Sequence, residues 1–196
     1  MIASAEPSDA ALVESALGGD QRAYTRLVSR HKEAVYKLIR RYGVDVEDAY
    51  DLSQQTFISA WSSLRRYDLG RPFATWVKTI ALNKCRDWSR RAAVRRFLLS
   101  PLSFDSAAVD AVPSTALDAE ADALAQERQT ALAMAVAGLP KTLKEPLLLT
   151  ALEGLTQREA AELLGISTKA VETRLARARR TLASRLEPDL QRGRPD

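Results

Sequence analysis

Cysteine and histidine are almost absent from this chain of 196 residues, which has one of each, Cys85 and His31. A single cysteine excludes an intrachain disulfide and favours a reducing compartment. One cysteine and one histidine are too few to form a zinc site, so we expect no metal and no cofactor.

The chain also lacks long apolar runs and has few aromatic residues, at 6%. No stretch approaches the length of a membrane span, and the start, Met-Ile-Ala-Ser-Ala-Glu-Pro, is unlike a secretory signal. We therefore expect a cytoplasmic protein without membrane insertion. A Gly-rich phosphate loop, a nucleophile elbow and a paired acid/base motif are also missing, which argues against an enzyme.

The charge balance is mildly basic. Charged residues make up 28% of the chain and hydrophobic residues 46%, with a net charge of +4. Such an excess fits a protein that approaches a polyanion with part of its surface, and it fits an ordinary basic soluble protein equally well. The positions of the charges must decide between the two.

Hydrophobic residues recur at helical spacing throughout, and no alternating strand pattern is convincing. We predict an all-α protein of two small helical domains, 8–93 and 118–187. In the first domain we expect helices capped by Asp9 and Asp20, which end at Gly18-Gly19 and Gly43, and helices over Val46–Leu64 and Phe73–Arg91. In the second we expect helices over Glu120–Ala137, Leu143–Leu152, Thr156–Leu164 and Thr168–Leu186, and Pro146 places the start of the second of these near Lys144.

Residues 94–117 are predicted to form a flexible acidic linker. Their central part, 97–115, is rich in Ser, Pro, Ala and Asp and has no basic residue. Such a composition does not bury enough surface to order itself. The acids are either ordinary solubilising groups of a spacer or groups that enter a basic channel of a partner.

The segment from Thr156 to Arg180 has the pattern of a helix-turn-helix. Thr156 and Glu159 form a capping box, Gly165 allows the tight turn, and Ser167 or Thr168 caps the second helix. Burial of the inward face leaves a polar outward face at the start of the second helix, where this motif meets the major groove. The predicted DNA-facing residues are Thr168, Lys169, Glu172, Thr173, Ala176 and Arg177, with Arg174, Arg179 and Arg180 placed for backbone phosphates. The alternative is a plain helical hairpin with a solvated basic face.

The two predicted domains in this order, joined by a variable linker, resemble the sigma factors of bacterial RNA polymerase, specifically the extracytoplasmic-function group. The residues that carry the resemblance are Tyr24-Thr-Arg-Leu-Val, Asp51–Trp61 and Phe73–Trp88 in the first domain, and Leu139-Pro140 and Glu153–Arg179 in the second. It covers nearly the whole chain outside the linker and the termini.

The resemblance implies that the third helix docks on a coiled coil of the β′ subunit of core polymerase. The residues implied are Asp51, Gln54, Gln55, Phe57 and Trp61. Gln55 stands where many members carry glutamate, so one charged contact is weaker or replaced. Phe57 and Trp61 are read either as partner contacts or as core residues.

The resemblance also implies that the fourth helix opens and reads the −10 element. Asn83 matches a position of the family's base pocket, and Trp76 is expected near the double-to-single-strand junction. The full set implied for −10 DNA is Arg66, Arg71, Trp76, Lys78, Asn83, Lys84, Arg86, Arg90 and Arg91. Cations at a helix end are also favoured for local reasons, which is a second interpretation of Arg90 and Arg91. Val77, Ala81 and Trp88 are expected in the core, and Cys85 as a buried filler.

The implied function is promoter recognition without catalysis: the two domains meet the −10 and −35 elements at once and help open the DNA. The implied partners are core RNA polymerase with its β′ and β subunits, promoter DNA in duplex and single-stranded form, and an anti-sigma factor. The rival interpretations are a dimeric duplex-binding regulator and a helical adaptor. Neither rival interpretation explains both the Asp51–Trp61 segment and the fourth helix with its basic and aromatic residues.

Overall fold

The computed structural model describes residues 6–99 and 119–192, and over these residues it is helical and has no strand. The chain divides into two compact units, one of residues 1–40 and 46–103 and the other of residues 41–45 and 104–196. The predicted all-α class is confirmed. Residues 100–117 of the expected linker lie outside the described residues.

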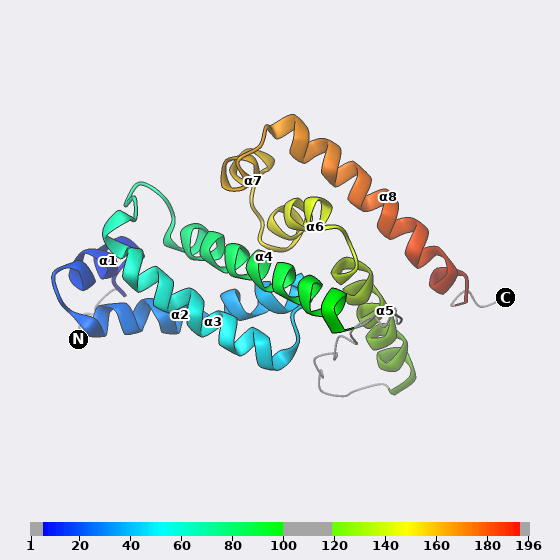
Figure 1. Ribbon diagram of the computed structural model, residues 1–196, viewed down its shortest axis with the longest axis horizontal. Helices are drawn as coiled ribbons and strands as arrows, with labels where there is room; N and C mark the ends of the chain where they lie inside the picture. Colours follow the sequence, from blue (N-terminus) through cyan, green and yellow to red (C-terminus); the bar gives the residue numbers. More distant parts are fainter. Residues whose placement is uncertain (1–5, 100–118, 193–196) are drawn as a thin grey trace. The chain divides into compact units, whose positions relative to one another are not determined.

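Four helices make up the first unit: α1 (Asp9–Leu17), α2 (Gln21–Tyr42), α3 (Val46–Ser63) and α4 (Phe73–Leu99), with a 3-10 turn at Leu64–Arg66 after α3 (Figure 1). Leu27, Leu38 and Leu82 are fully buried between them. The cap of α1 is Ser8, whose hydroxyl accepts a hydrogen bond from the Ala11 N–H at 3.2 Å, and the predicted cap Asp9 is the first helical residue instead. The predicted cap of α2 is confirmed, because the Asp20 carboxylate accepts from the Arg22 N–H at 2.9 Å.

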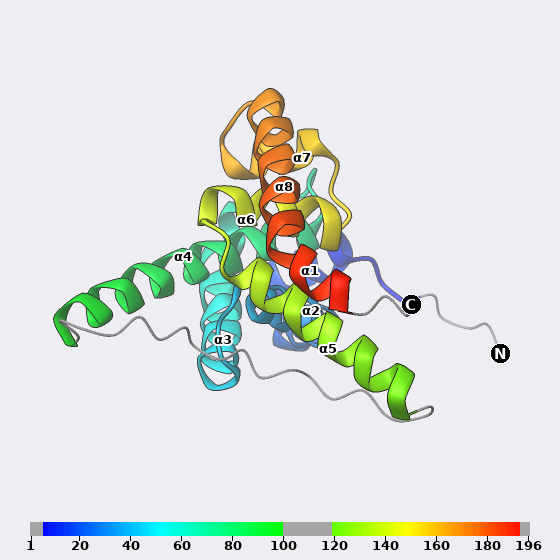
Figure 2. The ribbon, with the colours of Figure 1, turned by 90° about the vertical axis from the view of Figure 1, so that its right-hand side faces the viewer.

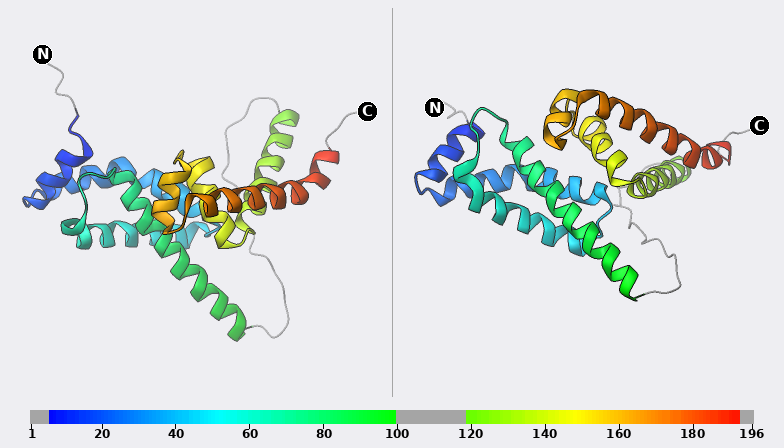
Figure 3. Two further views of the ribbon diagram at one scale, coloured as in Figure 1. Left: turned by 90° about the horizontal axis from the view of Figure 1, so that it is seen from above. Right: turned by 45° about the horizontal axis from the view of Figure 1, so that its top comes forward.

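Helix α4 continues to Leu99, several residues past the predicted end near Arg91 and into the predicted linker 94–117. Its last turns extend beyond the ends of α2 and α3 (Figure 3), and Arg90, Arg91 and Val94 are exposed there. The sequence from Ala92 to Leu99 has no glycine or proline to stop a helix. The helical spacing was therefore the better guide here than the change in composition.

The second unit holds α5 (Ala119–Ala137), α6 (Lys141–Leu147), a π-helical turn (Leu148–Leu152), α7 (Gln157–Leu164) and α8 (Thr168–Arg192). Helix α8 runs past α5 and α6 in Figure 2 and packs on α5, α6 and α7. The predicted start of α6 near Lys144 is wrong. The Pro140 carbonyl accepts from the N–H groups of Leu143 and Lys144, both at 2.9 Å, so the helix starts at Lys141 and includes Pro146.

Within the described residues, no helix has the length and apolar character needed to cross a bilayer. The same residues contain no group of three or more histidine, cysteine or acidic side chains able to hold a metal ion.

Candidate nucleic-acid interface

The helix-turn-helix of the second unit forms as its sequence predicts. The Thr156 hydroxyl accepts from the Glu159 N–H at 3.2 Å, and the Glu159 carboxylate accepts from the Thr156 N–H at 2.8 Å. The Thr156 hydroxyl also donates to the Glu159 carboxylate at 2.7 Å, and this hydrogen bond, together with the one from the Thr156 N–H, lowers the pKa of Glu159. Gly165 has a φ of 66°, the left-handed conformation that ends α7 and turns the chain into α8.

Small and branched side chains pack α8 against α7, and the opposite face of α8 is exposed to solvent. Ala160 and Ala161 on α7 and Val171, Leu175 and Ala178 on α8 are buried, each at most 4% exposed. The outward orientation predicted for the start of α8 is confirmed. Exposed there are Thr168, Lys169, Glu172, Thr173, Ala176, Arg177, Arg179 and Arg180, while Arg174 is half-buried.

Two of these outward residues are paired with each other. The Lys169 ammonium lies 2.9 Å from the Glu172 carboxylate, one turn along the helix. The Thr173 hydroxyl donates to the Lys169 carbonyl at 2.9 Å. Because Glu172 neutralises Lys169, the cations that stand without a paired acid in the contacts described on this face are Arg177, Arg179 and Arg180.

On the first unit, α3 exposes the polar residues singled out from the sequence. Asp51, Gln54 and Gln55 are exposed, and Trp61 is 42% exposed. Phe57 is only 7% exposed, which supports its interpretation as a core residue. Ile58, which the sequence reasoning missed, is 65% exposed and lies one turn after Gln54. The signal for Ile58 was its place on the helix face shared by Asp51 and Gln55.

An apolar hollow of about 440 Å³ lies beside Ile58, between α2 and α3. Its walls are Gln21, Tyr24, Thr25, Phe57, Ile58 and Trp61. The rings of Tyr24 and Trp61 are 4.7 Å apart, and the Tyr24 hydroxyl donates to the Phe57 carbonyl at 2.5 Å. Burial raises the pKa of Tyr24 to about 12, so the phenol stays neutral and keeps donating. Most of the walls of this hollow between α2 and α3 are therefore aromatic or aliphatic side chains.

One side of helix α4 is polar and begins with an aromatic residue, Trp76. Trp76, Asn83 and Arg90 follow one another at intervals of about two turns and share one side of the helix. The Arg86 guanidinium donates to the Asn83 side-chain oxygen at 2.9 Å, and Arg90 pairs with Asp87. Arg86 therefore fixes the orientation of the Asn83 amide, whose N–H groups point away from that contact.

The remaining residues predicted for −10 DNA are spread around α4 and the loop before it. Arg66, Arg71, Asn83, Arg90 and Arg91 are exposed, while Trp76, Lys78, Lys84 and Arg86 are half-buried. Val77, Ala81 and Cys85 are fully buried, as predicted. Trp88 is only half-buried, because its indole N–H donates to the Asp48 carboxylate at 2.5 Å and stays near the surface.

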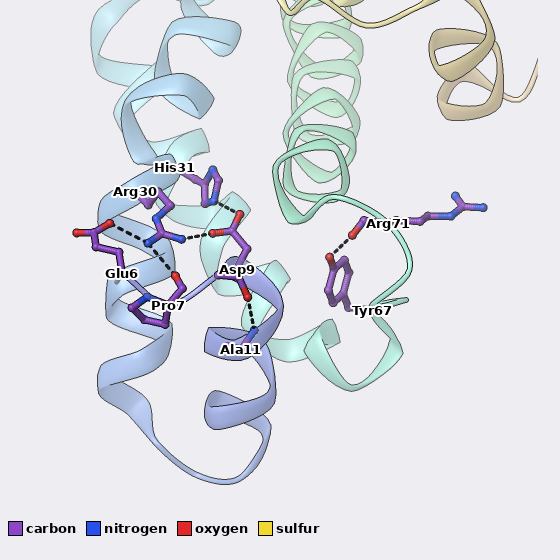
Figure 4. Close-up of polar contacts among 9 residues, drawn as sticks. Glu6, Pro7, Asp9, Ala11, Arg30, His31, Tyr67 and Arg71 are labelled. Atoms are coloured by element: carbon purple, nitrogen blue, oxygen red, sulfur yellow. Dashed lines mark hydrogen bonds and ion pairs between the residues drawn. The ribbon is translucent and has the colours of Figure 1, made fainter. Parts of the chain in front are cut away.

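Aromatic rings gather where the loop 67–72 enters α4. The ring of Tyr67 lies 4.9 Å from Trp76 and 5.7 Å from Phe73, and Phe73 lies 5.6 Å from Trp76. The Tyr67 hydroxyl donates to the Arg71 carbonyl and so closes the loop (Figure 4). Beside this cluster is a hollow of about 670 Å³, whose walls include Asp9, Arg30, Tyr67, Arg71 and Phe73. Sequence reasoning named Arg71 and Trp76 but missed Tyr67 and Phe73.

Comparison with known proteins identifies the family. Residues 27–95 match the Sigma-70 region 2 family and residues 129–182 match the Sigma-70, region 4 family. The chain is 36% identical to the RNA polymerase sigma factor CnrH of Cupriavidus metallidurans, over 95% of this chain and 98% of CnrH. It is 31% identical to the ECF RNA polymerase sigma-E factor of Haemophilus influenzae, over 92% of this chain and 96% of that factor.

The chain belongs to the extracytoplasmic-function sigma factors. A sigma factor directs core RNA polymerase to promoters and catalyses no reaction itself, so the predicted function and the absence of enzymatic activity are confirmed. Among solved structures, that of CnrH in complex with the cytosolic domain of CnrY matches with a TM-score of 0.68 and 34% identity, over 93% of this chain and 99% of CnrH. RpoE of Bartonella quintana, solved with the anti-sigma factor NepR, matches at 20% identity with a TM-score of 0.67 over 84% of this chain and 96% of RpoE, which shows a shared fold.

Proposed function

We propose that this sigma factor divides its work among three surfaces: α3 docks on core RNA polymerase, α4 captures the opened −10 strand, and α8 reads the −35 duplex. The observation that carries the proposal is the arrangement of the first unit. There, α3 and α4 pack on each other yet present chemically different outward faces. One face is polar with isolated apolar residues, and the other combines aromatic rings, an amide and cations.

For docking, we propose that Asp51, Gln54, Gln55, Ile58 and Trp61 contact the β′ coiled coil. Their exposure supports this proposal, because a buried side chain contributes nothing to a partner. A carboxylate with two amides can pair with arginine and amide groups, and the two apolar side chains supply area to bury. Phe57 is buried beneath this face and, as part of the core, supports the positions of Ile58 and Trp61.

For strand capture, we propose that one unstacked base binds near Asn83 and that Trp76 covers the end of the remaining duplex. An amide held by Arg86 has N–H groups available for a base edge, and aromatic rings replace the stacking that the base loses. Positive charge for the backbone of the strand comes from Arg66, Lys78, Lys84 and Arg91, and from Arg71 and Arg90, which are ion-paired with Asp68 and Asp87 in the free protein.

For duplex reading, we propose that Thr173 and Arg177 reach base edges and that Arg174 and Arg180 reach phosphates, with Lys169 and Glu172 at the groove entrance. Thr168 and Ala176 lie on the same exposed face. The two domains, with proposed bounds 8–93 and 118–187, share one promoter, so binding by one raises the effective concentration of the other. We also propose a cytoplasmic location, because a sigma factor acts with RNA polymerase on DNA.

We further propose an anti-sigma factor as the regulator. CnrH was solved with a protein partner, the cytosolic domain of CnrY. In this chain, the hollow of Tyr24, Ile58 and Trp61 offers an apolar anchor point beside the polymerase-docking face. An inhibitor that fills it competes with core polymerase.

Transcript mapping tests the proposed function. Core polymerase with the full chain is supplied with DNA from the source cell, and the 5′ ends of the transcripts are sequenced. We expect starts that share upstream −10 and −35 elements and that vanish without the chain. The same starts from core polymerase alone would contradict the proposal.

A further inference from the structure

An ionic cluster joins α1 to α2 at the end of the first unit where α4 begins. Both oxygens of the Asp9 carboxylate are engaged: Oδ1 accepts from Arg30 at 2.6 Å, and Oδ2 lies 2.8 Å from His31 Nε2 (Figure 4). Arg30 also donates to the Glu6 carboxylate at 3.2 Å and to the Pro7 carbonyl at 3.1 Å. The start of α1 is thus fixed on α2.

One member of this ionic cluster, His31, also lies against the aromatic cluster. The His31 ring lies 5.3 Å from the ring of Phe73, and its side chain is 12% exposed. The tautomer of His31 with its proton on Nε2 donates a hydrogen bond to the Asp9 carboxylate across this 2.8 Å contact. The hydrogen bond fixes the plane of the imidazole. The imidazole in turn packs beside the ring of Phe73.

Phe73 transmits this constraint to the proposed strand-capture surface. It is the first residue of α4 and only 1% exposed, and its ring contacts both Tyr67 and Trp76. Asp9 acts on the same loop electrostatically. Partial burial raises the pKa of the Tyr67 phenol, and the carboxylates of Asp9 and Asp68 raise it further. A neutral Tyr67 keeps its hydrogen bond to the Arg71 carbonyl.

We propose that Asp9 and His31 are positioning residues for promoter opening: they hold Phe73, and through it Trp76 and the loop 67–72, in the arrangement that accepts the unpaired strand. This inference rests on the proposed role of Trp76 in strand capture. It assigns to α1 a part in DNA opening, although α1 carries none of the residues proposed to touch DNA. Capture of a flipped base needs a surface that is already in place, because each side chain that must be ordered during opening adds a cost.

The test measures opening separately from assembly. Full-length Asp9→Asn and His31→Ala are combined with core polymerase at saturation, and the rate of opening is followed by permanganate reactivity of thymines in the −10 region. Affinity for core and the thermal midpoint of the free protein are measured alongside. We expect opening to slow about 2- to 10-fold, the effect of one lost partly buried hydrogen bond, with core affinity unchanged.

Two conservative variants separate the contacts of His31. His31→Gln keeps an N–H donor for Asp9 but loses the ring, and His31→Phe keeps a ring against Phe73 but loses the hydrogen bond. We expect each to open faster than His31→Ala and more slowly than wild type. Glu33→Gln is the matched control, since it removes an exposed ion pair with Lys37 on the same helix without touching the cluster.

Trp76→Ala provides the reference that keeps the two proposals apart. Wild-type opening in Asp9→Asn and His31→Ala, together with slow opening in Trp76→Ala, would overturn the positioning role alone. Wild-type opening in Trp76→Ala as well would overturn the strand-capture proposal too. A loss of opening that follows an equal loss of core affinity or of folded protein would assign the cluster a purely structural role and also overturn the inference.

Discussion

The outward faces of α8 and α4 differ in how many parts of the chain build them. The face of α8 comes from one helix, whose back is fixed on α7 by Val171, Leu175 and Ala178. The corresponding surface of α4 is composite. It combines Trp76 and Asn83 of the helix with Tyr67 of the loop, and it is backed by His31 of α2 and Asp9 of α1.

This difference fits two kinds of DNA. A duplex presents the same groove shape before and after binding, so a single rigid helix with exposed polar residues suffices to read it. Unpaired bases must be given stacking surfaces and hydrogen bonds to replace those of the duplex. A composite surface supplies these from several elements, and it depends on contacts that hold those elements together.

The largest expected effect is on polymerase docking, for which all the proposed contact residues lie on α3 of the first unit. Asp51→Arg should weaken binding to core polymerase by at least about tenfold, because it replaces a partner for a cation by a like charge. Fluorescence anisotropy of the labelled chain with core enzyme measures this. Glu33→Arg, an equal charge change on the exposed face of α2, is the control and should bind normally. Unaltered affinity in Asp51→Arg would show that this face of α3 does not dock.

The next effect is on opening. Asn83→Ala should slow opening of the −10 element, or change its base preference, by about 5- to 100-fold, the range for losing a two-point contact to a base. Core affinity should be retained, since Asn83 lies on α4 and not on α3. Permanganate reactivity on promoters with each base at the flipped position measures both quantities. Unchanged opening and unchanged preference would reject the base site at Asn83.

An effect of comparable size should separate two arginines of α8. Arg177→Ala should weaken −35 binding and relax the preference at one base pair, by about 1–3 kcal/mol. Arg180→Ala should weaken binding to all sequences alike and lower the slope of log K against log salt by about 1. Duplex titrations at several salt concentrations measure both. Equal salt slopes with a relaxed preference in both variants would contradict this division of α8.

The smallest effect concerns the local hydrogen bonds that support the second unit. Thr156→Ala should lower the free energy of unfolding by about 1 kcal/mol at neutral pH, because it removes the capping box. The capping box lowers the pKa of Glu159 below its ordinary value of 4.5, so its stabilisation is present above that value and is lost as the pH falls through the folded-state pKa.

Urea unfolding at several pH values tests the capping-box prediction. The difference between Thr156→Ala and wild type should shrink below pH 4.5, the ordinary value for Glu159. A difference that stays constant down to the most acid sample would contradict the role of the carboxylate.

Sequence patterns predicted most of the helices because caps and spacing act locally. The capping box of Thr156 and Glu159, the Gly165 turn and the exposed face of α8 all follow from neighbours within a few residues. The predicted end of α4 near Arg91 was wrong, since no residue from Ala92 to Leu99 breaks a helix and α4 continues to Leu99.

Most of the residues predicted for the candidate site lie on a single helix, and Arg66 and Arg71 were named beside them. Asn83 and Arg177 were found by spacing and by resemblance. Tyr67, Phe73 and the pair of Asp9 and His31 were missed because their roles depend on contacts between residues far apart in the sequence. Ile58 was missed because an exposed isoleucine carries no motif, although its place on the helix face of Asp51 and Gln55 and its 65% exposure set it apart.

In the proposed function, polymerase docking and capture of the melted strand use separate helix faces of the first unit. A titration of core polymerase against Asp51→Arg and Asn83→Ala, with −10 thymine reactivity as the readout, tests this most directly. Raising core concentration should restore full opening to Asp51→Arg and leave Asn83→Ala impaired. Restoration of both variants, or of Asn83→Ala only, would contradict the separation.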